Sequence, residues 1–124
     1  MPLKRSNYKV LGMPVGPYVH AVQHGDILYL SGLTAYGTSG QGKDISEQVK
    51  VIFQQIEHIC QMENTTLSNI IKVTIYVTDM AAMAELRQAL FDVYGEHIPA
   101  SSLVHVESLF SSDVDIEIEA IIGL

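Results

Sequence analysis

The feature that most constrains the fold is an alternation of apolar and acidic residues near the end of the chain. Residues 114–122 set Ile116, Ile118, Ala120 and Ile122 against Asp115, Glu117 and Glu119. Successive side chains of a strand point to opposite faces, so this segment predicts a strand with one apolar and one polar face. Residues 70–77 predict a second strand, with the β-branched Ile71, Val73, Ile75 and Val77 on one face. The chain must therefore build a sheet that buries one face.

Two segments between these strands have helical periodicity. A helix is predicted over residues 46–62, because apolar residues recur there at three- and four-residue spacing and Asp44 with Glu47 resembles a capping box. The apolar set is Ile45, Val49, Ile52, Phe53, Ile56 and Cys60. Asn64 is expected to end this helix. A second helix is predicted over residues 80–94, between a cap at Asp79 and a stop at Gly95.

The remaining segments predict a sheet of one domain. Residues 19–23 and 27–31 form a predicted hairpin turning at His24-Gly25-Asp26, residues 102–107 form another strand, and an extra strand is expected near residues 7–11. The order β-β-α-β-α-β-β predicts an α+β two-layer sandwich, a mixed sheet with two helices on one face. The 124 residues fit a single domain, 1–124.

Composition excludes several classes of function. Fourteen acidic residues against seven basic ones, with no basic cluster, disfavour binding to nucleic acid. No apolar run approaches the length of a membrane span and the first residues lack a signal-peptide core, so we expect a cytoplasmic protein without a membrane partner. The single cysteine, Cys60, is expected in the core. The five histidines lack metal-ligand spacing, and we expect neither a metal nor a cofactor.

Several short motifs resemble one known family. They are Val15-Gly16-Pro17-Tyr18, Leu30-Ser31-Gly32, Pro99-Ala100-Ser101-Ser102-Leu103-Val104 and Ile116-Glu117-Ile118-Glu119-Ala120. Together they resemble the reactive-intermediate deaminases, the Rid/YjgF or endoribonuclease L-PSP-like family of imine and enamine hydrolases, along nearly the whole chain. The resemblance implies a chorismate-mutase-like fold and a homotrimer with three ligand clefts at the subunit boundaries. Ser101 stands where the family has an arginine, so this chain resembles a divergent member.

The same resemblance assigns three residues to the expected cleft. Glu117 occupies the position of the family's glutamate, which holds or activates water; alternatively it is a solvated or cross-strand partner on a polar sheet face. Tyr18 matches a tyrosine that lines the family's pocket, although its ring could equally be packing. Ser31 matches the family's Ser-Gly, but Leu33 replaces the glutamine that usually follows.

The loss of the arginine draws attention to three other side chains. A guanidinium grips a carboxylate with two parallel hydrogen bonds, which the hydroxyl of Ser101 cannot reproduce. On a helical wheel Arg87 falls within the apolar stripe of the second predicted helix, where it either supplies the missing charge or is a snorkelling or ion-paired arginine. Leu103 stands where close relatives often have cysteine, and His105 is either a proton-transfer group or structural.

Two hypotheses of function follow. In the first, the chain is a hydrolase of imines, enamines or related carboxylate metabolites, with catalytic Glu117 and His105 and weak or no activity on standard 2-imino acids. Tyr18, Ser31, Arg87, Ser101 and Leu103 would then bind the small-molecule ligand. In the second, it is a non-catalytic trimeric protein that binds a small ligand or regulates another process.

Overall fold

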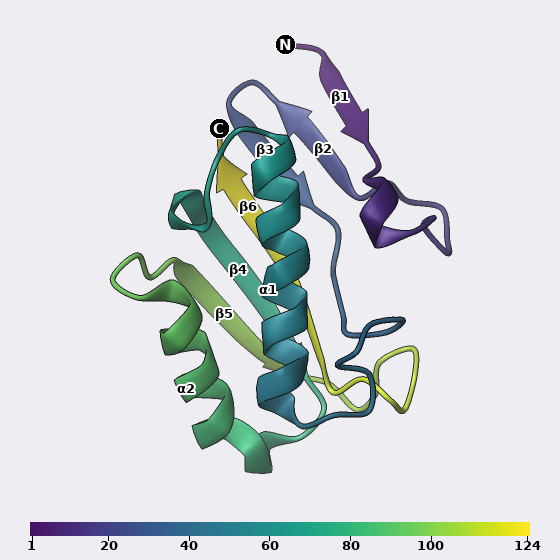
Figure 1. Ribbon diagram of the computed structural model, residues 1–124, viewed down its shortest axis with the longest axis vertical. Coiled ribbons are helices and arrows are strands. Elements are labelled where there is room, and N and C mark those ends of the chain that lie inside the picture. The colour runs from purple at the N-terminus through teal and green to yellow at the C-terminus, as the bar shows by residue number, and fades with distance from the viewer.

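The computed structural model describes all 124 residues and contains a six-stranded sheet in the order β1-β2-β3-β6-β4-β5 (Figure 1). The strands are β1 (Leu3–Ser6), β2 (Ala21–His24), β3 (Ile27–Leu30), β4 (Ile70–Val77), β5 (Ala100–His105) and β6 (Ile116–Gly123). All neighbours are antiparallel except β4 and β5. A parallel pair needs a long crossover, and the segment joining these two strands contains a helix.

Both helices, α1 (Ile45–Met62) and α2 (Met83–Tyr94), lie on one face of the sheet (Figure 1). This arrangement confirms the predicted α+β sandwich with a mixed sheet. The core lies between the two layers, where β6 contributes the four apolar residues of its alternation and α1 contributes the apolar set predicted for it. Cys60 is buried there, as expected.

The helix ends follow the expected chemistry. The Asp44 carboxylate accepts a hydrogen bond from the Glu47 amide at 3.0 Å, which satisfies one of the free N–H groups of the first turn of α1. Asn64, just beyond α1, adopts a positive φ of 59°. Asp79 caps a 3₁₀ turn at Met80–Ala82 that leads into α2, and Gly95 ends α2 with a φ of 58°.

Two details of the predicted strands are wrong. The extra N-terminal strand lies at Leu3–Ser6 and not near residues 7–11, because Tyr8 turns into the core and residues 9–11 form a 3₁₀ turn. Ile71 does not share the buried face of β4. A register shift between Ile70 and Lys72 turns Ile71 outward, and Ile70 takes its place in the core.

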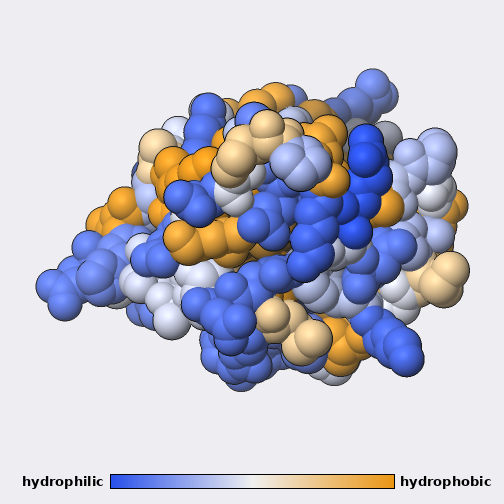
Figure 2. All heavy atoms as spheres, turned by 90° about the horizontal axis from the view of Figure 1, so that it is seen from above, coloured by the Kyte–Doolittle hydropathy of each residue, from blue (hydrophilic) through white to orange (hydrophobic).

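The face of the sheet opposite the helices is not covered by any other element of the chain. Glu117 and Glu119 project from β6 onto this open face, together with Thr74 and Tyr76 of β4. Seen from the end at which both termini lie, the surface combines apolar patches with hydrophilic ones (Figure 2). Neither helix has the length and apolarity needed to cross a membrane.

Candidate functional site

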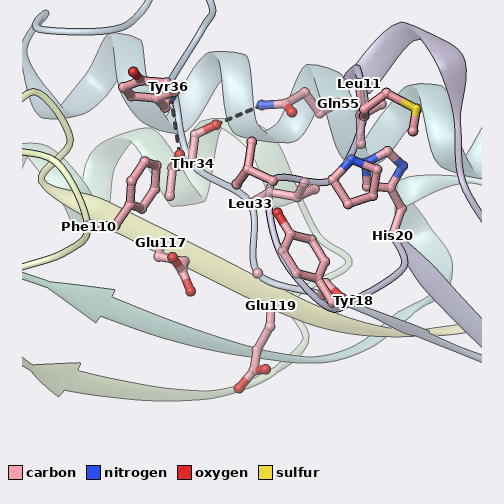
Figure 3. A pocket seen from close by; sticks show the side chains of 15 residues that line it. Leu11, Tyr18, His20, Leu33, Thr34, Tyr36, Gln55, Phe110, Glu117 and Glu119 are labelled. Atoms are coloured by element: carbon pink, nitrogen blue, oxygen red, sulfur yellow. Dashed lines mark hydrogen bonds between the residues drawn. The ribbon is translucent and has the colours of Figure 1, made fainter.

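A groove of about 600 Å³ opens where the chain leaves β3 (Figure 3). One wall is the N-terminal segment from Leu11 to Tyr18, and another is the connection that follows β3. Glu117 and Glu119 of β6 supply the acidic side of the groove, while Phe110 approaches from the connection between β5 and β6. Four segments that are distant in sequence thus meet around one concave surface.

The position of Glu117 depends on a glycine in the neighbouring chain segment. After β3 ends, the backbone rejoins β6 through paired hydrogen bonds between Leu33 and Ile118 of 2.9 and 3.0 Å. Gly32 lies just before this bridge, and a Cβ atom on it would come within 2.8 Å of the Glu117 carboxyl carbon. The absence of a side chain at Gly32 therefore creates the space that the carboxyl group occupies.

The two glutamates of the groove differ in their hydrogen bonding. Tyr76 donates to the Glu119 carboxylate at 2.8 Å, so Glu119 has the cross-strand role that was one alternative for Glu117. Glu117 receives no hydrogen bond from the chain, and burial, together with the neighbouring charge of Glu119, raises its pKa. A partly buried carboxyl group with a raised pKa and free oxygens can hold a water molecule and exchange a proton with it.

Tyr18 and Ser31 lie in the same groove as Glu117. The Tyr18 amide donates to the Gly16 carbonyl at 2.9 Å, which closes a tight turn at Pro17 and directs the half-exposed phenol into the groove (Figure 3). The Ser31 hydroxyl donates to the Val19 carbonyl at 2.6 Å. Its proton is thereby occupied, and a ligand would find only an acceptor on that hydroxyl.

The predicted residues on β5 do not reach this groove within one chain. Ser101, Leu103 and His105 pair with buried residues of β4, so their side chains lie on the helix-side face, whereas Glu117 lies on the open face. β4 also separates β5 from β6. All six residues of β5 are exposed, and the His105 ring has one hydrogen-bond partner, the Thr78 carbonyl, at 3.3 Å.

Arg87 also lies outside the groove. The expectation that it falls within the apolar stripe of α2 is wrong, because the buried centre of that helix is Leu86 and Arg87 is exposed. The side of α2 that faces the core is centred on Leu86, with Met83, Leu90 and Val93 beside it. Arg87 lies next to this side, toward solvent. The exposed position of Arg87 leaves its guanidinium accessible to a ligand or to another molecule.

Sequence reasoning missed several groups that shape the groove. Tyr36 and Phe110 form an edge-to-face aromatic pair with ring centroids 5.1 Å apart, although they come from different loops (Figure 3). Gln55 of α1 donates to the Thr34 carbonyl at 2.9 Å and fixes the connection after β3. His20 lines the groove while only 6% exposed. Loop pairings of this kind leave no periodic signal, but the position of His20, two residues after Tyr18, was a usable hint.

A family model described as endoribonuclease L-PSP matches residues 11–123, which is most of the chain. The chain belongs to the Rid/YjgF family. A Pyrococcus horikoshii member, RutC family protein PH0854, is 35% identical over 112 residues, covering 87% of each chain. An Escherichia coli K12 protein provisionally named reactive intermediate deaminase TdcF is 30% identical over 112 residues, covering 86% of each.

The fold of this Rid/YjgF chain also matches solved structures. The crystal structure of yeast Mmf1 superposes with a TM-score of 0.88 at 30% identity and covers 98% of each chain. Within the present chain, no three histidine, cysteine, aspartate or glutamate side chains come close enough together to hold a metal ion.

Proposed function

We propose that this Rid/YjgF protein hydrolyses small imines or enamines in the groove beside Glu117. The observation that carries the proposal is the Glu117 carboxyl group, which lies in the space left by Gly32, has a raised pKa and has no partner within the chain. Such a group can orient a water molecule toward an electrophilic carbon and accept its proton.

The reaction consumes one water molecule. Its oxygen bonds to the carbon of the C=N group, its proton passes to Glu117, and the nitrogen takes up a proton as the double bond becomes single. Glu117 then returns its proton to this nitrogen, the C–N bond breaks and nitrogen leaves as ammonia or an amine. As the carbonyl forms, the hydroxyl oxygen gives its proton to the group that first protonated nitrogen, so both groups end in their starting state. We propose His105 of a neighbouring copy as the group that supplies a proton to nitrogen, since an imidazole can do so near neutral pH.

We propose that the complete cleft forms between copies of the chain in a homotrimer. The supporting feature is the separation of two sets of residues: Glu117 lies on the open face, whereas Ser101, Leu103 and His105 of the edge strand β5, with Arg87 of α2, are exposed on the helix side of the sheet. The open face also exposes apolar side chains, including Tyr29 at 47% and Val104 at 40%. A neighbouring copy that covers this face would bury them and could bring its own β5 edge to the groove.

The substrate preference should differ from that of members that carry the arginine. No lysine or arginine lines the groove, and Ser101 lacks the fork that grips a carboxylate. Losing such a charge-assisted contact costs about 1.5–3 kcal/mol, or roughly 10- to 100-fold in rate. We therefore propose weak or absent activity on 2-imino acids, with Arg87 of a neighbouring copy as a substitute anchor for carboxylate-bearing ligands.

A second candidate function is non-catalytic binding of a small ligand. Ser101 and Leu33 favour it, because each removes a polar group that the resembled enzymes keep in the cleft. Nuclease activity is disfavoured by the excess of fourteen acidic over seven basic residues, which opposes binding of a phosphate backbone.

The test measures ammonia release from two imines generated in situ. One carries a carboxylate (2-iminobutyrate), and the other does not (the imine formed when benzylamine is oxidised). Glu117→Gln should abolish hydrolysis of the preferred imine, while the matched control Glu119→Gln should retain most of it. Ser101→Arg should raise activity on 2-iminobutyrate. If wild type accelerates neither reaction and Ser101→Arg gains nothing, the binding-protein alternative replaces this proposal.

A further inference from the structure

A buried histidine in the groove wall has one ring nitrogen fixed by the backbone. The Tyr8 amide donates a hydrogen bond to His20 Nδ1 at 2.9 Å, so Nδ1 must carry a lone pair. A neutral imidazole has one N–H, and with Nδ1 unprotonated the proton resides on Nε2. The geometry thus selects a single tautomer of His20.

The partners of His20 hold this arrangement from several sides. The Tyr8 ring stacks on the imidazole with centroids 6.1 Å apart and planes 13° apart, and the Tyr8 hydroxyl donates to Glu63 at 2.6 Å. The His20 amide donates to the Asn7 side chain at 3.0 Å. The ring therefore has little freedom to flip and exchange its two nitrogens.

The other nitrogen, Nε2, is not fully shielded from solvent. Nε2 has no hydrogen-bond partner within the chain. The Tyr94 hydroxyl oxygen is the only side-chain polar atom that is both fully buried and without a partner, so Nε2, which also lacks a partner, cannot be fully buried. Nε2 is therefore accessible, and His20, which lines the groove, lies beside Leu11 and Tyr18 (Figure 3). Burial lowers the pKa of His20, and a second proton on Nδ1 would face the Tyr8 N–H, so the ring stays uncharged at neutral pH.

We propose that His20 is a ligand-binding residue whose Nε2–H donates a hydrogen bond to an oxygen acceptor, a carbonyl or carboxylate, of the molecule held in the groove. This inference rests on the groove being the binding site of the proposed function. It assigns a fixed, uncharged donor on the wall opposite Phe110 and Glu117 (Figure 3). Glu117 would meet the reacting carbon, and His20 would orient the ligand by its oxygen.

The first measurement is ¹⁵N NMR of the wild-type imidazole without and with small probes at millimolar concentration. The expected spectrum shows a protonated Nε2 and an unprotonated Nδ1 in the free protein. Benzamide offers a neutral carbonyl and benzoate a carboxylate, so their separate titrations distinguish the two kinds of acceptor; benzylamine, protonated and without an acceptor, is the control. At least one of the first two should shift the Nε2–H signal, and benzylamine should not.

The second measurement uses His20→Asn, because the asparagine oxygen can still accept from the Tyr8 amide while nothing remains at the position of Nε2. Affinity for the probe that shifts the signal should fall about 3- to 10-fold, and affinity for benzylamine should be unchanged. His24→Asn, the same substitution at an exposed histidine of β2 that does not line the groove, should leave both the His20 tautomer and the probe affinity unchanged.

Three results would overturn the proposal: a proton on Nδ1 in the free protein, an Nε2–H signal unmoved by both benzamide and benzoate, or equal probe affinity in wild type and His20→Asn. None of these readouts requires turnover. A protein that binds benzamide through His20 but hydrolyses no imine would retain this inference and lose the proposed function.

Discussion

The contact between Gly32 and Glu117 gives a sharp prediction for Gly32→Ala. A methyl group at this position would lie 2.8 Å from the Glu117 carboxyl carbon, which is 0.6 Å closer than the 3.4 Å at which ordinary contact begins. The backbone of Gly32 does not have a positive φ, so alanine brings no conformational strain. The carboxyl group, at the end of a flexible side chain, must move away. A displacement of this order in a reacting group costs about 10- to 100-fold in rate, whereas relaxation keeps the stability loss within about 1 kcal/mol.

The assay compares imine hydrolysis and urea unfolding of wild type, Gly32→Ala and Gly123→Ala. Gly123 is the matched control because a Cβ there would meet its nearest neighbour, the Asn69 carbonyl oxygen, at an ordinary 3.7 Å. We expect a rate loss in Gly32→Ala alone. Hydrolysis that is unchanged in Gly32→Ala, or lowered equally in both variants, would refute the argument that the free space at Gly32 positions Glu117.

Three further predictions concern stability. Gln48→Leu should lower the free energy of unfolding in urea by about 3 kcal/mol, because the buried Gln48 amide donates to an Asp115 carboxylate oxygen at 2.8 Å and accepts from the Asp115 amide at 2.9 Å; a loss below that of an average surface substitution would contradict it. Asp44→Ala should cost about 1 kcal/mol by the same measurement, since it removes the cap of α1, and no loss would mean that the cap is dispensable. The raised pKa of Glu117 means that the folded chain binds this proton more tightly than the unfolded chain, so its contribution to stability is present below the unfolded pKa and is lost as pH rises through the folded pKa. The stability of wild type relative to Glu117→Gln should therefore fall across that pH interval, and a constant difference would show that the pKa is not raised.

Regular elements were predictable because their signals are local. The alternation around Ile118 places every second residue of β6 in the core, and the spacing around Ile52 does the same for α1. The failures occurred where a tertiary contact overrides the local pattern. Tyr8 turns into the core toward His20 and Glu63, which moves the first strand upstream, and a bulge rotates Ile71 out of β4.

The candidate site was predictable only where family motifs mark it. Tyr18, Ser31 and Glu117, which the resemblance assigns to the cleft, line one groove, and their role in binding a ligand stays a prediction. The pairing of Tyr36 with Phe110 depends on how two loops lie across the sheet, which no periodicity encodes. Ser101, Leu103 and His105 of β5 face away from the groove of their own chain, and the expectation that a cleft containing them joins two copies came from the family resemblance and not from any periodicity.

The central claim, a site shared between neighbouring copies, is tested most directly by subunit mixing. One chain carries Ser101→Arg together with Glu117→Gln and so has the arginine without the glutamate; the other is wild type, with the glutamate and no arginine. Trimers assembled from equal amounts of the two should recover about a quarter of the 2-iminobutyrate activity of Ser101→Arg, since that fraction of boundaries joins the two intact halves. Each chain alone should show little or none of this activity. A mixture no more active than its separate components would contradict the shared site.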